Sequence, residues 1–194
     1  MPRTSGNSPC VETWSTWPWG SSWGRPARRP RPEAAAGRIT GMAEQDFSRT
    51  YGVKWADLDP NGHVRHSVYD DYAVDTRVRW MEMNGFPPVR FSELGFGPVI
   101  LRQESRFYRE VTIEDSLVVT IRLTGLSQDG SRWKVHHDIL KSSGEKAAAL
   151  DIEGSWLDLR SRKAMVPPVE LLKLFTEVQR SAEIEELRSL VRRE

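Results

Sequence analysis

The feature that most constrains this chain is a short polar segment that runs directly into a long amphipathic helix. Residues 57–66 read Asp-Leu-Asp-Pro-Asn-Gly-His-Val-Arg-His, so two carboxylates, one amide and two imidazoles fall in one turn-rich stretch. The helix predicted after it directs its first backbone N–H groups and the positive end of its dipole toward these side chains. Together these groups supply what the hydrolysis of an ester or thioester needs.

A helix is predicted from Ser67 to the Asn84-Gly85 pair, because a glycine here suits the left-handed residue that ends a helix. Ser67 and Asp70 have the spacing of a capping box. At about 1.5 Å per residue the helix is about 27 Å long, enough to span a small domain. Apolar side chains recur at steps of three and four on one face, namely Tyr69, Tyr72, Ala73, Thr76, Trp80 and Met83.

One strand is predicted before the helix, over residues 47–55, and at least four after it. Residues 99–110, 117–124, 133–139 and 148–156 read as strands, with turn signals at 128–130 and 143–144. Short connections favour an antiparallel meander over a parallel sheet, so the predicted fold class is α+β. The side chains expected to share a buried face are Leu117, Val119, Ile121 and Leu123, then Trp133, Val135, His137 and Ile139, then Ala148, Leu150, Ile152 and Trp156.

One strand, one long helix and an antiparallel meander follow one another in the order of the hotdog fold, in which the sheet wraps around a central helix. Residues 45–160 resemble a single-hotdog thioesterase of the 4-hydroxybenzoyl-CoA thioesterase family. The Asp-Pro-Asn-Gly-His-Val core at residues 59–64 is also similar to the motif of acyl-ACP thioesterases. Tyr108 to Val119, with Glu114-Asp115 in the turn, match the strand-turn-strand of the family.

The resemblance implies roles for the residues of the motif. Asp59 falls on the catalytic carboxylate, which either attacks the thioester carbonyl or acts as general base on a water, and both routes remain open. Asn61 and His63 match the amide and imidazole that orient the carboxylate, the water or the substrate carbonyl. His66 and Ser67 stand at the helix start, where backbone N–H groups would polarise the carbonyl, so both are expected to bind substrate.

Structural explanations compete for several polar residues. Asp-Pro-Asn-Gly is a good turn in its own right, which is an alternative role for Asn61. Asp57 is interpreted as structural rather than catalytic. His136 and His137 are adjacent in a strand and face opposite sides, which is typical of packing and surface residues.

Metal sites find no support in the sequence. Residues 57–62 imitate the start of an EF-hand loop, but Val68 stands where the loop needs a bidentate Glu. Cys10 is the only cysteine, and His63 and His66 lack the flanking pattern of a zinc site. No metal or other cofactor is therefore expected.

The chain divides by composition into three segments. Residues 1–41 are rich in Pro, Arg and Trp and are predicted to be a disordered extension. This segment is an extension ahead of a start at Met42, an organellar transit peptide or a binding segment, and the first is preferred because residues 42–44 open directly onto the first strand. Residues 42–165 form the predicted hotdog domain. Residues 166–194 are predicted to be helical, starting at Pro167-Pro168, with Val169, Leu172, Phe175 and Val178 on one face.

The net charge of +1 offers no whole-chain argument for nucleic-acid binding. No run of about 18 apolar residues suits a membrane span, and no apolar region suits a secretory signal. The resemblance implies a thioesterase that cleaves an acyl-CoA or acyl-ACP, and the lack of a span or secretory signal predicts that it is cytoplasmic. The resemblance implies a homodimer or homotetramer with the site between subunits. The alternatives are a non-catalytic acyl-thioester sensor and a dimeric interaction module with a Trp-rich tail, and Asp59 together with His63 favours the enzyme.

Overall fold

The computed structural model describes residues 47–177 and 180–191. The predicted disordered extension of residues 1–41 lies outside the described residues. In chain order the elements are β1 (Ser48–Gly52), the 3₁₀ helix Trp55–Asp57, α1 (His66–Met83), α2 (Pro88–Leu94), β2 (Phe96–Phe107), β3 (Ser116–Thr120), β4 (Arg122–Ser127), β5 (Arg132–Lys141), β6 (Lys146–Asp158), β7 (Ala164–Met165), α3 (Val169–Glu177) and β8 (Arg180–Leu187).

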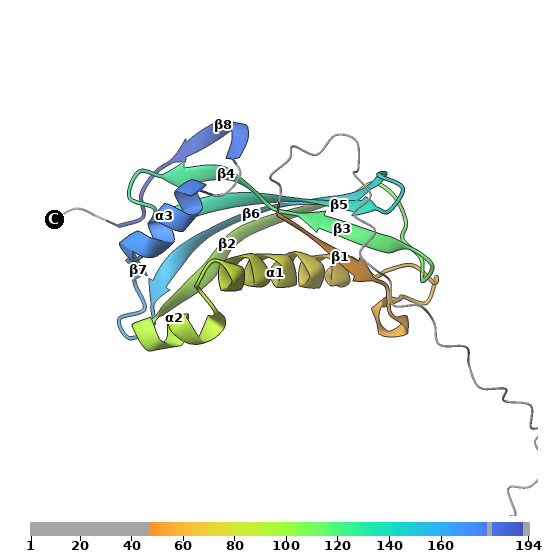
Figure 1. The fold of residues 1–194 in the computed structure, drawn as a ribbon, viewed down its shortest axis with the longest axis horizontal. Coiled ribbons are helices and arrows are strands. Elements are labelled where there is room, and N and C mark those ends of the chain that lie inside the picture. The colour runs from red at the N-terminus through yellow and green to blue at the C-terminus, as the bar shows by residue number, and fades with distance from the viewer. Residues whose placement is uncertain (1–46, 178–179, 192–194) are drawn as a thin grey trace, which may run out of the picture. The chain divides into compact units, whose positions relative to one another are not determined.

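The described strands form one eight-stranded sheet. Its path runs β1-β3-β5-β4-β8, and β6 extends it from β5 to β2 and β7. All pairs are antiparallel except β4 with β8, which is parallel. Figure 1 shows α1 running along one face of the curved sheet, which confirms the predicted α+β hotdog fold.

The core lies between α1 and the sheet. The helix buries Val68, Tyr69, Tyr72, Ala73, Thr76, Trp80 and Met81. The inward faces of β5 and β6 hold the side chains predicted from alternation, namely Trp133, Val135, His137, Ile139, Ala148, Leu150, Ile152 and Trp156. Burying one large apolar side chain stabilises a fold by about 1.5–3 kcal/mol, so this shared face holds helix and sheet together.

An aromatic cluster closes the core near α2 and α3. Phe91 of α2 stacks on Trp156 at 6.1 Å between ring centroids, and Phe175 of α3 meets the same indole edge-on at 5.5 Å. The Trp156 indole N–H donates to the carbonyl oxygen of Gly130 at 3.0 Å. Through Phe175, the segment after residue 165 packs onto the hotdog core.

The start of α1 differs from the prediction. The helix begins at His66, its N-cap residue is Arg65, and no side chain caps it, so the predicted Ser67–Asp70 capping box is wrong. The backbone explains this, because Arg65 N–H donates to the Asp57 carbonyl at 2.9 Å and Val64 N–H donates to the Val111 carbonyl at 2.8 Å. These bonds fix where the chain turns into the helix without a side-chain cap.

The strand boundaries also differ from those predicted. The predicted strand 117–124 is two strands, with the break at Ile121, because β3 pairs with β1 whereas β4 pairs with β8. The predicted first strand ends before Trp55, which lies in the 3₁₀ helix with 81% of its surface exposed. A hydrogen bond of 2.9 Å from Asp57 N–H to the Lys54 carbonyl turns the chain there. The helix α2 was not predicted.

Among the described residues of the predicted helical segment 166–194, the prediction is correct only for α3, and Val178 lies outside the described residues. Beyond it, β8 lies parallel to β4, so the expectation of a helix over residues 180–187 is wrong. The apolar residues Ile184 and Leu187 are three apart, a spacing that favours a helix, because a strand places such residues on opposite faces. The free edge of β4 supplies backbone partners, and Lys134 donates to Glu185 at 2.9 Å. None of the described helices is long and apolar enough to cross a membrane.

Candidate active site

The polar motif forms a tight turn that is closed by its own backbone. Asp59 N–H donates to the His63 carbonyl at 2.8 Å, and Gly62 N–H donates to the Asp59 carbonyl at 3.0 Å. Gly62 has φ of +80°, a conformation that side chains other than glycine's rarely adopt. A bridge between Leu58 and Val64 closes the base of the turn. The motif is therefore a rigid turn placed just before α1.

Asp59 accepts two backbone hydrogen bonds on the same carboxylate oxygen. Its Oδ1 lies 2.8 Å from the Asn61 nitrogen and 3.2 Å from the His63 nitrogen. Partial burial disfavours ionisation, but these hydrogen bonds and the nearby Asn61 side chain outweigh it and hold the pKa of Asp59 below its ordinary value. The carboxylate is thus ionised at neutral pH, and Oδ2 takes neither backbone bond.

The side chains of Asn61 and His63 point to different surroundings. Asn61 is exposed. Its backbone N–H donates the hydrogen bond to Asp59 Oδ1 described above. The His63 imidazole is half-exposed, and its Nε2 lies 3.4 Å from Glu110 Oε2. Glu110 follows β2 and was not identified from the sequence. The structure therefore joins His63 to Asp59 through the backbone and leaves its ring beside a second carboxylate.

His66 and Ser67 lie in the first turn of α1, and both are exposed. The first N–H groups of a helix have no carbonyl in a preceding turn to bind, so this end of α1 offers donors and a positive dipole end. The motif turn precedes it directly. Local geometry thus permits a substrate carbonyl to approach this end of the helix.

Asp57 has a structural environment, in agreement with its interpretation from the sequence. Its Oδ2 accepts from the Lys54 backbone nitrogen at 2.8 Å and from the Tyr72 hydroxyl at 2.8 Å. Burial, followed by the bond to Asp57, raises the pKa of the Tyr72 hydroxyl, which therefore stays protonated and donates. Through the hydrogen bond to Tyr72, the Asp57 carboxylate connects the segment before the motif to α1.

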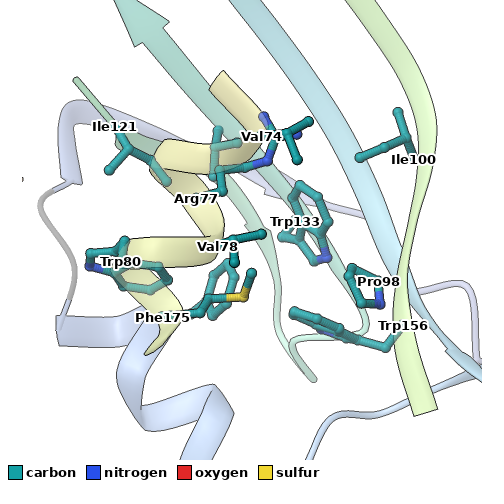
Figure 2. Close-up of a pocket in the computed structure, with 12 residues that line it drawn as sticks. Val74, Arg77, Val78, Trp80, Pro98, Ile100, Ile121, Trp133, Trp156 and Phe175 are labelled. Carbon is teal, nitrogen blue, oxygen red and sulfur yellow. The ribbon is translucent and has the colours of Figure 1, made fainter. Parts of the chain in front are cut away.

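A cavity of about 210 Å³ lies between α1, the sheet and α3. Among the described residues that line it, all are apolar except the charged Arg77 (Figure 2). The motif residues do not line it. Arg77 is eleven residues beyond the start of α1, which is about 16 Å along a helix. Within one chain the motif and the cavity therefore lie at different places along α1.

Sequence reasoning did not single out Arg77. Its spacing was the available signal, because it follows Ala73 by four residues and precedes Trp80 by three, which places it beside the buried face of the helix. The described part of the chain contains no group of three or more His, Cys, Asp and Glu side chains suited to a metal ion.

Solved structures show the same fold. A 1,4-dihydroxy-2-naphthoyl-CoA thioesterase from Synechocystis has 17% identity and a TM-score of 0.63, over 68% of this chain and 96% of that one. A Staphylococcus aureus protein solved in complex with CoA has 18% identity and a TM-score of 0.62, over 71% and 88%. A DHNA-CoA thioesterase from Staphylococcus aureus has 13% identity and a TM-score of 0.63, over 68% and 89%.

No curated protein matches the chain. The family comparison is decisive, because residues 53–175 match the thioesterase-like superfamily and include both the motif and the cavity wall up to Phe175. This confirms the family resemblance inferred from the motif and the order of the elements. The chain belongs to the thioesterase-like superfamily and has the hotdog fold.

Proposed function

We propose that this protein hydrolyses an acyl thioester to a free acid and a thiol, and that Asp59 is its catalytic carboxylate. The observation that supports this most is the geometry of Asp59 in a chain of this superfamily. Two backbone bonds to Oδ1 keep the carboxylate ionised and oriented, and the turn that carries it precedes the N-terminus of α1. A charged oxygen on a turn that leads into a helix N-terminus with N–H donors suits attack on a carbonyl.

Two routes are compatible with this arrangement. As nucleophile, Asp59 attacks the thioester carbonyl carbon, the thiolate leaves and takes a proton, and water then hydrolyses the mixed anhydride. As general base, Asp59 takes a proton from water as the water attacks, and the tetrahedral intermediate expels the thiolate. In both routes negative charge develops on the former carbonyl oxygen, and N–H groups at the start of α1 near His66 and Ser67 would stabilise it. Asn61 and His63 would orient the carboxylate or the substrate.

The carrier of the acyl group is proposed to be CoA, with ACP as the alternative. Support for CoA comes from proteins of the same fold, because one was solved with CoA and two are thioesterases of a naphthoyl-CoA. The Arg65-His66 pair stands where acyl-ACP thioesterases carry paired Asn, which weakens the case for ACP. No nucleic acid is expected to bind, and the cytoplasm remains the predicted location.

We further propose that the working enzyme is a homodimer or homotetramer. Among the described strands β2 pairs only with β6, so its other edge is free. Near this edge Ile100, Leu101 and Phe107 are each about half exposed. A long edge strand with apolar side chains invites pairing with another chain, and two-fold symmetry is the commonest solution. We propose that this pairing brings the motif of one subunit beside the cavity of the other, so that the two form one site.

The direct test is a thiol-release assay on a panel of acyl-CoA and acyl-ACP thioesters. Hydrolysis by the parental protein, and its loss in Asp59→Asn, would support the proposal. Asp71→Asn is the matched control, because Asp71 is an exposed carboxylate on α1 away from the motif turn. Binding of acyl thioesters without hydrolysis would favour the sensor instead.

A further inference from the structure

Among the described residues that line the apolar cavity, only Arg77 is charged. It extends from α1 beside Val74, and Figure 2 shows these two residues at one end of the cavity while Pro98, Trp156 and Phe175 lie at the other. Burial lowers the pKa of Arg77 to about 10, so the guanidinium is still charged at neutral pH. Arg77 is partly buried, so water solvates its charge incompletely and a partner of opposite charge would stabilise it.

The partner that the chain provides is neutral. Fully buried His137 has its Nδ1 2.7 Å from the Thr120 carbonyl oxygen and its Nε2 3.1 Å from Arg77 Nη1. A carbonyl only accepts and a guanidinium only donates, so Nδ1 carries the proton and Nε2 accepts. Burial, with the Arg77 charge added, lowers the pKa of His137 to about 3, in agreement with a neutral ring. His137 therefore positions the guanidinium without neutralising it.

No described carboxylate pairs with Arg77 within 4.0 Å. The carboxylate whose negative charge favours the charged form of Arg77 is that of Asp70. It lies seven residues earlier on α1, which is about 10 Å along the helix axis. Neighbouring Arg79, in contrast, lies at the surface 2.6 Å from Glu82. Arg77 thus lines the cavity with a positive charge that no described carboxylate at hydrogen-bond distance offsets.

We propose that the acyl group received by this cavity carries a carboxylate, which pairs with Arg77. The proposal rests on the proposed thioesterase function and names its substrate class, an acyl thioester of a dicarboxylic or carboxyl-substituted acid. The apolar wall would hold the hydrocarbon part, and the guanidinium would bind the two carboxylate oxygens with its remaining donors. A substrate of this kind supplies the negative charge that the site lacks.

The size of the cavity limits the length of the acyl group. A protein cavity of about 150 Å³ holds one benzene molecule, so about 210 Å³ suits a chain of about six to eight carbons or one substituted ring. Adipoyl-CoA and suberoyl-CoA are therefore suitable probes. Hexanoyl-CoA and octanoyl-CoA are their partners with a methyl end in place of the carboxylate.

The kinetic test compares kcat/KM for these two pairs in the full-length protein. A hydrogen-bonded charge pair in an apolar site predicts a preference for the carboxyl-ended member of roughly 10- to 100-fold. Arg77→Met keeps an extended side chain without charge and should remove or invert this preference. Arg79→Met, which removes a surface guanidinium two residues away, should keep it. Equal rates for both members, or a preference for the methyl end, in the parental protein would overturn the proposal while leaving thioester hydrolysis intact.

A binding test separates this inference from the proposed function. Titration calorimetry with hexanoate and with 1-hexanol, which share a hydrocarbon chain and differ in charge, needs no hydrolysis. We expect hexanoate to bind at least about tenfold more tightly than hexanol, and Arg77→Met to lose this difference. If no thioester is hydrolysed but this difference is found, the enzyme proposal fails and the anion site stands. If thioesters are hydrolysed but Arg77→Met binds hexanoate as the parent does, the anion site fails.

Discussion

Replacing Gly154 with alanine should push an indole ring into the cavity. Gly154 lies on β6 directly opposite Trp133 of β5, and a Cβ built there would lie 2.2 Å from Trp133 Cζ2. Carbon atoms in contact prefer about 3.5–4.0 Å, so the ring must move by at least about 1.3 Å. The Trp133 ring lies on the face of the sheet that carries Gly154. A new methyl group on this face therefore pushes the ring away from the sheet and toward α1, where the cavity lies.

Two quantities should change in Gly154→Ala. Overpacking of a core costs about 1–3 kcal/mol, which for a chain of this size lowers the melting temperature by about 2–12 °C. The cavity should also shrink at its Trp133 wall, so the acyl panel should shift toward shorter groups. Thermal unfolding followed by circular dichroism and kcat/KM across the panel measure the two effects.

The control for this change is Gly52→Ala in β1, where an added Cβ would meet nothing within 4 Å. This variant should match the parent within about 0.5 kcal/mol. If Gly154→Ala also matches the parent in melting temperature and in acyl preference, the packing of Trp133 on Gly154 and its place in the cavity wall are wrong.

Three further predictions concern charge and assembly. Neutral buried His137, with its pKa near 3 against about 6.5 when unfolded, makes the fold lose up to about 1.4 kcal/mol per pH unit as the pH falls from 6.5 toward 3. Urea unfolding should show a weaker acid dependence for His137→Gln than for the parent, and an unchanged slope would contradict this. Arg77→Met removes a partly buried cation that has no counter-ion among the described carboxylates and should raise the melting temperature, whereas a fall of several degrees would mean that the charge is paired in the assembled protein. Leu101→Lys on the free edge of β2 should shift the sedimentation profile toward monomer, and an unaltered oligomer would place the interface elsewhere.

The parts of the fold that were predicted correctly have a local period. Alternation placed Trp133, Val135, His137 and Ile139 on one face of a strand, and steps of three and four marked the buried side of α1, except that Met83 at its last position is 75% exposed. Both patterns follow from backbone geometry and are therefore visible in the sequence. The boundaries were less predictable, because hydrogen bonds from Arg65 and Val64 to distant carbonyls, rather than a capping side chain, decide where α1 begins.

The strand β8 shows why the C-terminal segment could not be predicted. The spacing of Ile184 and Leu187 favours a helix, but the segment forms a strand because β4 offers an edge to it. That edge belongs to residues 122–127, far away in the sequence. Non-local pairing of this kind overrides local preference.

One part of the candidate site could be predicted from local sequence, and another part depends on contacts between distant residues. The turn that holds Asp59 could be predicted because its Asp, Asn and Gly carry turn chemistry in consecutive positions. The pairing of Arg77 with His137 could not, since the two residues are far apart in the sequence and one looked like a packing residue. The separation of motif and cavity along α1 also required the structure.

The most direct test of the account is the rate of thioester hydrolysis by Asp59→Asn. Asparagine keeps an Oδ1 that accepts from the Asn61 and His63 backbone, so the turn should persist while the charge is lost. We predict that kcat falls by roughly 10²- to 10⁴-fold with acyl-thioester binding retained, that Asn61→Ala and His63→Ala each cost less, and that Asp71→Asn keeps the parental rate. An Asp59→Asn protein that hydrolyses thioesters at the parental rate would contradict the account.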